Sequence, residues 1–465
     1  MSFLKKYIGD RAFYRVVLGV AVPMMIQNGI TNLVNLLDNV MVGSISTEAM
    51  SGVSIVNQYI FIFNLLVFGA TSAAGIFTAQ YHGSGDVEGV RYTFRFKFIV
   101  NALAGALSVL AFAAFSEPLI RMFLHAGSVE GDLEMTLAHG ETYLMVMLAG
   151  LIPYAIAQAY ASTMRETGET VVPMAASAAA VLTNFALNCV LIFGLFGLPA
   201  LGVLGAAVAT VVSRGIELGI LLWWGYRHPE RCPYLEGALH ALTLPPSLFG
   251  RIMFKGLPLM LNEFFWAAAI TLRNQCYSTR GLDVVAAQNI STTIVNLFSV
   301  VFFALGGSIA IVVGNELGAG NIEKARDSAR KMMAFSIFSA LLMALLLVVT
   351  SVLFPRLYNA GEEVRRLSTF MILASAALLP FNAYAHAAYF TLRSGGRVAV
   401  TLLFDSVYMW VLALPLVFVL SRFTDMGIEW LFVAGQSVEI IKCAFGAVLL
   451  HKINWARTLV GKASA

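Results

Sequence analysis

Twelve long apolar runs alternate with short polar segments along this chain. The first six fall at roughly 14–42, 53–80, 95–115, 139–163, 170–196 and 201–226, and the second six at roughly 252–278, 288–316, 331–354, 366–392, 396–421 and 427–451. A helix needs about 20 predominantly apolar residues to cross the hydrocarbon core of a bilayer. The pattern therefore predicts an all-α integral membrane protein with twelve transmembrane helices.

The composition excludes a large soluble protein. Of the 465 residues, 59% are hydrophobic and only 12% are charged, whereas a soluble domain carries about 25% charged residues. The mean hydropathy is +0.79. Because polar surface is scarce, the excess apolar side chains must face lipid as well as a protein core. The four cysteines have no paired spacing, which argues against a disulfide framework or a metal knuckle.

The basic N-terminal segment is not a cleaved signal. The apolar run after it is too long for a signal-peptide core, and no small-residue cleavage site follows. We therefore expect a retained first helix. With the N-terminus in the cytoplasm, most of the 30 lysines and arginines fall in cytoplasmic segments, which is the positive-inside pattern. Both termini are then cytoplasmic.

The chain contains an internal duplication. At an offset of 235 residues, the segment 21–28 lies over 256–263 and pairs Pro23 with Pro258, and the loop glycine Gly83 matches Gly318. A third match places 163–168 over 391–396. Six helices per half give both halves the same orientation, so a pseudo-twofold axis along the membrane normal relates them. We predict lobes at 1–226 and 252–465, joined by a cytoplasmic linker at 227–251.

Several motifs lie in a characteristic order on this duplicate. They are Val22-Pro23, Asp38-Asn-Val-Met-Val-Gly43, Arg165-Glu-Thr-Gly168 with its partner Arg393-Ser-Gly-Gly396, the segments 184–194 and 202–210, and Gly256-Leu-Pro258 leading to Asn262-Glu263. Over essentially the whole chain, this order resembles the multidrug and toxic compound extrusion (MATE) family. The resemblance implies efflux of amphipathic, often cationic compounds, driven by inward flow of sodium ions or protons.

Competing classes of protein fit less well. The chain has no G-x-x-x-x-G-K-[S/T] phosphate loop and no soluble segment long enough for a nucleotide-binding domain. The segment 82–91 does not match the loop between helices 2 and 3 of the major facilitator fold. No clustered His/Asp or Ser/His motif lies at a membrane face, so we do not expect an enzyme.

One acid on the first helix has no base nearby in sequence. Asp38 lies at the edge of a stripe of amide side chains that recur on one helical face. Ionisable groups at bilayer depth are costly and are functional candidates, and the resemblance places Asp38 on a carboxylate linked to cation coupling. With amide and carbonyl oxygens around it, such a carboxylate can carry a proton or hold Na⁺. The stripe consists of Asn28, Asn32, Asn35 and Asn39.

Helices 5 and 6 add further oxygen ligands. Asn184 and Asn188 are spaced i,i+4 and share one helical face. Many relatives have an aspartate at the second position, so Asn188 removes one charge from the site that the resemblance implies. Thr210 matches the helix 6 position and adds a hydroxyl. The alternative is that these three side chains are interhelical hydrogen-bonding groups.

The seventh helix carries a second candidate acid. Glu263 is either a coupling acid of the second half or a counter-ion for a substrate, and Arg273 could instead neutralise it along the helix. Asn274 lies at nearly the same helical angle as Glu263. His386, on the tenth helix, is a further candidate for the substrate cavity.

Other intramembrane charges have local partners. Arg214 with Glu217, and Glu439 with Lys442, are spaced i,i+3, a spacing that pairs them on one face. We interpret both as structural pairs. Asp405, on the eleventh helix, is a weaker candidate.

These features predict a secondary transporter that works by alternating access, and the resemblance to the MATE family implies export of amphipathic, drug-like organic cations in exchange for inward Na⁺ or H⁺. The coupling set is Asp38, Asn184, Asn188, Thr210 and Glu263. We expect no cofactor, no nucleic-acid partner, function as a monomer, and a place in the cytoplasmic membrane of a prokaryote. The alternative is a lipid-linked oligosaccharide flippase, which a basic central cavity would favour.

Overall fold

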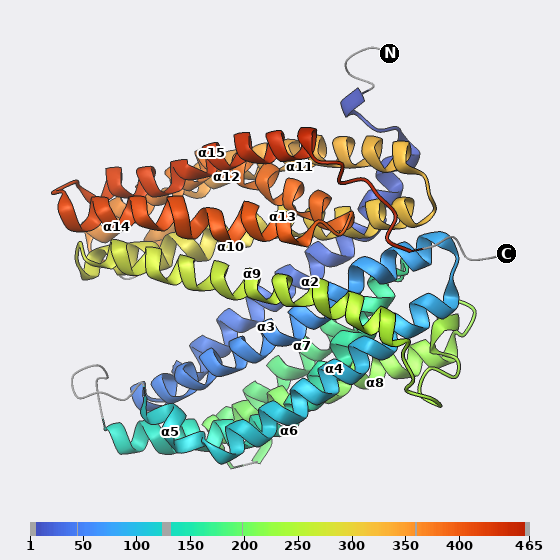
Figure 1. Ribbon diagram of the computed structural model, residues 1–465. Coiled ribbons are helices and arrows are strands. Elements are labelled where there is room, and N and C mark those ends of the chain that lie inside the picture. Colours follow the sequence, from blue (N-terminus) through green and yellow to red (C-terminus); the bar gives the residue numbers. More distant parts are fainter. Residues whose placement is uncertain (1–5, 44, 123–131, 198, 359, 461–465) are drawn as a thin grey trace. The chain divides into compact units, whose positions relative to one another are not determined.

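The computed structural model describes residues 6–43, 45–122, 132–197, 199–358 and 360–460, without the side chains at 34–40, 43, 47 and 282. Within these ranges the chain is helical and contains no β-strand. The predicted all-α fold is confirmed (Figure 1). Many large apolar side chains are exposed, among them Leu110, Leu345 and Val411 at 64–70%, as expected of surfaces that face lipid.

The described part of the first half contains seven α-helices. They are α2 (Arg11–Gly43), α3 (Thr47–Ser84), α4 (Val87–Ala114), the short α5 (Ser116–Arg121), α6 (Leu133–Glu166), α7 (Val171–Phe193) and α8 (Val203–Arg227). Helix α6 packs against α4 and α8, and α7 packs against α8. The segment after α8 contains turns and one short 3-10 helix, η2 (Pro233–Leu235).

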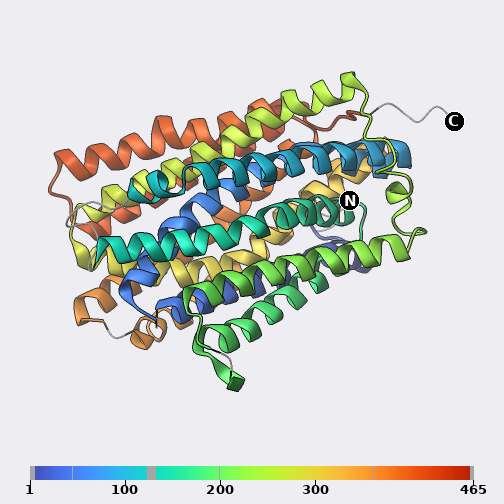
Figure 2. The same cartoon turned by 90° about the horizontal axis from the view of Figure 1, so that it is seen from below.

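The second half repeats this pattern. Its helices are α9 (Pro246–Ser278), α10 (Leu282–Gly318), α11 (Ile322–Thr350), α12 (Glu362–Ser394), α13 (Val398–Leu402), α14 (Leu414–Phe423) and α15 (Ile428–Lys452). Two π-helical segments, η4 (Leu403–Val407) and η5 (Met409–Ala413), connect α13 to α14. Helix α12 packs against α10, α11 and α15, and Figure 2 shows these helices from a second direction.

Each predicted span coincides with a helix, except that the span 396–421 coincides with the continuous run from α13 through η4 and η5 to α14. Most helices extend beyond the apolar run. Helix α4 begins at Val87 rather than near 95 because its first turn is polar and is capped by Asp86, which accepts a hydrogen bond from the Gly89 amide at 2.8 Å. Eleven helices in the described part are long and apolar enough to cross a membrane. Helix α9 has the length but not the apolar content, because it carries several charged and amide side chains.

The two halves match in helix length. Helices α2 and α9 both have 33 residues, α3 and α10 have 38 and 37, α4 and α11 have 28 and 29, α6 and α12 have 34 and 33, and α8 and α15 both have 25. A proline interrupts both members of two pairs, Pro23 and Pro258 in the first and Pro153 and Pro380 in the second. These matched lengths agree with a duplicated chain.

By packing, the chain divides into two compact units that interleave in sequence. Unit 1 comprises Met1–Met25, Ala79–Gly85 and Leu257–Ala465, and unit 2 comprises Ile26–Thr78 and Asp86–Gly256. In unit 1, Val17 and Ala21 of α2 are fully buried in a core that includes Leu305 and Ile309 of α10. Helices α2 and α9 thus each begin in one unit and end in the other, and each changes unit within two residues of Pro23 or Pro258. A proline inside a helix removes a backbone hydrogen bond and favours a kink.

Candidate functional site

Three of the predicted cation ligands meet in the interior of unit 2. The Asn188 amide donates to Asn184 Oδ1 at 3.2 Å, and the Asn184 amide donates to Thr210 Oγ1 at 3.2 Å. The two asparagines are only 1% and 4% exposed. Thr210 in turn donates to the Ala206 carbonyl at 3.0 Å. Helices α7 and α8 therefore bring amide and hydroxyl oxygens together at a buried point.

The remaining predicted ligand of this site lies outside the described side chains. Asp38 belongs to α2, whose backbone is helical throughout Arg11–Gly43, and the neighbouring Asn35 is likewise outside the described side chains. Asn28 and Asn32, at the start of the same amide stripe, are both exposed. Oxygen atoms of amides and hydroxyls are ligands for hard cations. The described part of the site thus has donor atoms of the kind that suit Na⁺.

A second buried polar cluster lies in unit 1 around Asn262 of α9. Its amide donates to Asp405 Oδ2 at 3.0 Å and to the Tyr389 hydroxyl at 3.3 Å. Its side-chain oxygen accepts from Ser406 Oγ at 2.8 Å and from the Ser406 amide at 3.3 Å. Asn262 is 1% exposed. One asparagine thus connects three helical segments of the second half.

Asp405 of this cluster is neutralised by a lysine from another helix. Lys442 Nζ lies 2.7 Å from Asp405 Oδ1, and their side chains are 8% and 16% exposed. Glu439, the partner of Lys442 expected from the i,i+3 spacing, lies at 4.0 Å. The expected Arg214–Glu217 pair is present at 3.3 Å. The interpretation of Lys442 was therefore incomplete, because the closer acid comes from the π-helical segment η4, 37 residues away in sequence.

Glu263 contrasts with Asp405. Its Oε1 accepts a hydrogen bond from the Tyr389 hydroxyl at 3.3 Å. Within the described ranges no lysine, arginine or histidine lies within 4.0 Å of its carboxylate. Arg273, considered above as its neutralising partner, forms no such pair, and its buried Nε has no hydrogen-bond partner among the described residues. Asn262 and the more distant Arg393 also act on this carboxylate. The cluster therefore contains one acid in an ion pair and one acid without an ion pair.

Asn274 and His386 also belong to unit 1. Asn274 accepts a hydrogen bond from the Gln288 amide at 2.7 Å. The His386 ring contacts Phe303 and Phe390 with ring centroids 4.9 Å apart, and it contacts Phe302 at 5.7 Å. These edge-on contacts are those of a packed aromatic group.

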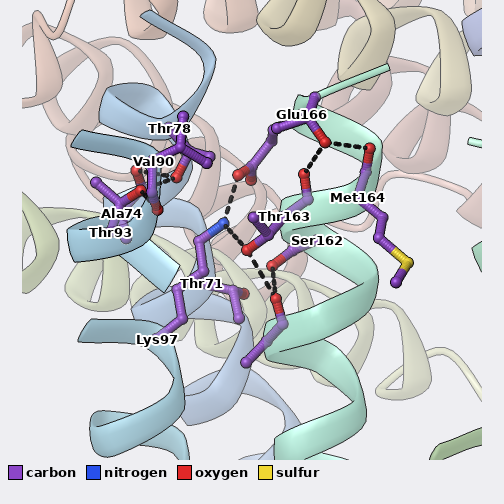
Figure 3. A network of polar contacts seen from close by, with 12 residues as sticks. Thr71, Ala74, Thr78, Val90, Thr93, Lys97, Ser162, Thr163, Met164 and Glu166 are labelled. Atoms are coloured by element: carbon purple, nitrogen blue, oxygen red, sulfur yellow. Dashed lines mark hydrogen bonds and ion pairs between the residues drawn. The ribbon is translucent and has the colours of Figure 1, made fainter. Parts of the chain in front are cut away.

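The sequence analysis missed one buried ion pair. Lys97 is fully buried on α4 and pairs with Glu166 at the end of α6 (Figure 3). Its Nζ also donates to Thr163 Oγ1 at 3.2 Å. The available signal was that Lys97 lies within the predicted apolar run 95–115. At the repeat positions, Met332 and Ser394 replace Lys97 and Glu166, so this pair is a feature of the first half only.

Long apolar helices in two matched halves, with carboxylates, amides and a lysine in their interior, define a polytopic membrane transporter. A family model, MatE, matches this chain twice, over residues 23–190 and 258–419. The chain belongs to the MatE family. The two matches begin at Pro23 and Pro258, which are the two prolines paired by the internal repeat.

Curated relatives and solved structures agree with this assignment. The chain is 24% identical over 423 residues to the probable multidrug resistance protein NorM of Thermotoga maritima, covering 90% of this chain and 88% of that protein. It is 24% identical over 412 residues to a protein of the same name from Oceanobacillus iheyensis, covering 88% and 89%. These relatives support a multi-pass membrane transporter of the multidrug efflux type.

The fold matches MATE structures over nearly its full length. A crystal structure of MATE in complex with MaL6 has a TM-score of 0.84 at 18% identity, covering 97% of this chain and 99% of that chain. A Vibrio cholerae MATE transporter, VcmN, has a TM-score of 0.85 at 19% identity, covering 96% and 98%. At this identity the likeness establishes the fold.

Proposed function

We propose that this transporter exports amphipathic organic cations in exchange for inward Na⁺ or H⁺. The observation that carries the proposal is the contrast between two acids of one buried cluster. Asp405 is held by Lys442 at 2.7 Å, whereas Glu263 forms no ion pair within 4.0 Å among the described residues. It accepts a hydrogen bond from the Tyr389 hydroxyl at 3.3 Å, and Arg393 acts on it only from farther away. An acid inside a membrane protein is costly to retain without a cationic partner. A transported cation or proton is a partner that can bind to the acid and then dissociate from it.

The first half supplies a second proposed coupling site. Asp38 on α2 would act with the buried oxygens of Asn184, Asn188 and Thr210, of which the last three are hydrogen-bonded to one another. Binding of a cation changes the local charge and therefore favours one arrangement of the helices over another. If the organic substrate favours the opposite arrangement, the two compete, and inward flow of the coupling cation drives outward export.

The proposed substrates are drug-like organic cations. The NorM relatives are named as multidrug resistance proteins, and MATE structures have been solved with the compounds MaL6 and MaD3S. Candidate cavity groups are Asn28, Asn32, Asn35, Glu263, Arg273, Asn274 and His386. The lipid-linked oligosaccharide flippase alternative finds no support among these relatives.

The proposal includes a membrane topology. Both termini and the linker at 227–251 would lie in the cytoplasm of a bacterial cell, with transport lobes at 1–226 and 252–465. A single chain would carry both coupling sites, so we propose function as a monomer.

Efflux from cells tests the proposal. Bacterial cells that express the full chain would be loaded with ethidium, and its release would be followed by fluorescence under imposed Na⁺ or pH gradients. We expect release to depend on at least one gradient, and Asp38→Asn or Glu263→Gln to lower the gradient-dependent rate at least tenfold. Glu134→Gln is the matched control, because its side chain is 72% exposed and lies outside both clusters. Efflux that ignores both gradients and both substitutions would overturn the proposal.

A further inference from the structure

A basic pocket lies in unit 1 where α11 begins and α15 ends. Its volume is about 620 Å³, which is within the range of small-molecule sites, about 300–1,000 Å³. Four basic side chains line it, and no acidic side chain does so among the described residues. The four are Arg326 and Arg330 of α11, and His451 and Lys452 of α15.

The positive charge of this pocket is only partly neutralised. Arg326 pairs with Glu323 at 3.0 Å, but both side chains are well exposed. The nearest acid to Arg330 is Asp327 at 4.0 Å, and Lys331 holds the same carboxylate at 2.6 Å. No carboxylate of the described residues lies within 4.0 Å of Lys452. The pocket therefore has a surplus of cationic donors that face solvent.

The internal repeat supplies a comparison within the same chain. At an offset of 235 residues, Arg91 and Arg95 of the first half correspond to Arg326 and Arg330. In the first half, backbone carbonyls of the segment after α8 accept from these arginines. Arg91 Nε donates to the Tyr234 carbonyl at 3.3 Å, and Arg95 Nε donates to the Ala238 carbonyl at 2.7 Å.

The second half lacks this arrangement. The segment after α15 offers Arg326 one acceptor, the Asn454 side-chain oxygen at 3.3 Å. Arg330 donates to no carbonyl oxygen in the described part of the chain, and its side chain is 38% exposed. In the first half, carbonyl oxygens of the segment after α8 bind the two arginines at the position that corresponds to this pocket. In the second half that position lacks these acceptors.

We propose that this pocket binds the phosphate headgroup of an anionic glycerophospholipid. Guanidinium groups bind phosphate oxygens in a bidentate geometry, and basic pockets between helices at the cytoplasmic face suit anionic headgroups. Tyr7 and Trp455 also line the pocket, and such aromatic residues are enriched where a membrane protein crosses the lipid–water interface. Only the choice of leaflet, the cytoplasmic one, rests on the topology proposed above.

The pocket also has an apolar wall, which favours a lipid over a free phosphate compound. Met333 and Leu450 line it beside the basic groups. On α15, Val448 and Ile441 are 49% and 55% exposed, so an apolar surface continues from the pocket along the helix. A headgroup in the pocket would therefore leave its acyl chains against this surface.

Native mass spectrometry of the full-length protein in detergent tests the proposal. Phosphatidylglycerol and phosphatidylcholine with identical acyl chains would be titrated separately. We expect the wild type to bind phosphatidylglycerol in preference, and Arg330→Gln/Lys452→Gln to weaken that binding about tenfold, since each basic residue contributes to anionic lipid attraction. The matched control is Arg227→Gln, at the corresponding end of α8 and also exposed. It should bind as the wild type does.

Two further measurements test the roles of charge and of the lipid's acyl chains. Arg330→Lys/Lys452→Arg retains both charges and should keep most of the binding, and an unfolding midpoint measured without added lipid shows that each variant is folded. Glycerol 3-phosphate should not displace the lipid at equal concentration. Equal lipid binding by the wild type and the double variant, or displacement by glycerol 3-phosphate, would overturn the proposal. The assay does not involve transport, so its outcome is separate from that of the efflux experiment.

Discussion

Gly83 and Gly318 make reciprocal backbone contacts at the ends of α3 and α10. A Cβ atom on Gly83 would overlap the carbonyl oxygen of Asn315, and a Cβ atom on Gly318 would overlap the carbonyl oxygen of Gln80. Both pairs are related by the repeat offset of 235 residues, and all four residues belong to unit 1. The two copies of one loop motif therefore form a symmetric crossing that only glycine permits.

Alanine at either glycine should weaken this crossing. The obstructing atoms are backbone atoms, which no rotamer change can move, so Gly83→Ala and Gly318→Ala should each destabilise the protein by about 1–3 kcal/mol, as overpacking does. Thermal unfolding in detergent would show a lower midpoint for both variants. Gly219→Ala is the control, since a Cβ there meets no atom within 4 Å. An unchanged midpoint for both variants would contradict the close crossing.

Removing Lys442 should be costly because Asp405 would remain buried without its partner. Loss of one partner of a buried ion pair destabilises by about 3–5 kcal/mol, so Lys442→Met should lower the thermal unfolding midpoint strongly. Asp405→Asn/Lys442→Met removes both charges and should recover much of the loss. If the single and the double variant unfold at the same temperature, the unpaired Asp405 carboxylate is not what destabilises the single variant.

The surroundings of His386 predict that its ring packs rather than carries protons. Phe302, Phe303 and Phe390 all contact the ring. His386→Phe should therefore keep ethidium efflux within about twofold of wild type at every pH, while His386→Gln should lower the thermal midpoint. A proton-relay role would instead abolish pH-dependent efflux in both variants.

An aspartate at position 188 should make the stability depend on cations. In the wild type the Asn188 amide donates to Asn184 Oδ1 at 3.2 Å. Asn188→Asp would set two acceptor oxygens against each other, an arrangement that only a bound cation or a proton relieves. We expect the thermal midpoint of this variant to rise with NaCl and to rise less with choline chloride. Equal responses to both salts would show that no cation binds there.

Much of the fold could be predicted from the sequence because membrane helices are defined by length and apolar content. The repeat was visible through Pro23 and Pro258, since a helix-interrupting residue is conspicuous in an apolar run. The predicted starts of α4 and α11 were late, at 95 and 331 instead of Val87 and Ile322, because their first turns are polar. The division into lobes at 226 and 252 stays a prediction. It was inferred from the internal repeat, whereas units 1 and 2 were defined by packing, and the two criteria measure different properties.

The candidate sites were predicted less completely. The helical spacing of Asn184 and Asn188 shows that they share a face, and the structure places Thr210 beside them. Local spacing could not identify Asp405 as the partner of Lys442, or Glu166 as the partner of Lys97, because both pairs join different helices. Tyr389 escaped notice for the same reason, since only helix packing brings its hydroxyl to Glu263. The coupling roles of Asp38 and Glu263 stay predictions.

Competition between two cations for the purified protein is the most direct measurement of the proposed coupling. Equilibrium binding of tetraphenylphosphonium would be measured as a function of Na⁺ concentration and of pH, for the wild type, Asp38→Asn and Glu263→Gln. We predict that Na⁺ or acid weakens wild-type binding at least tenfold and that at least one substitution removes this effect. Wild-type binding that does not change with either Na⁺ or pH would contradict the account.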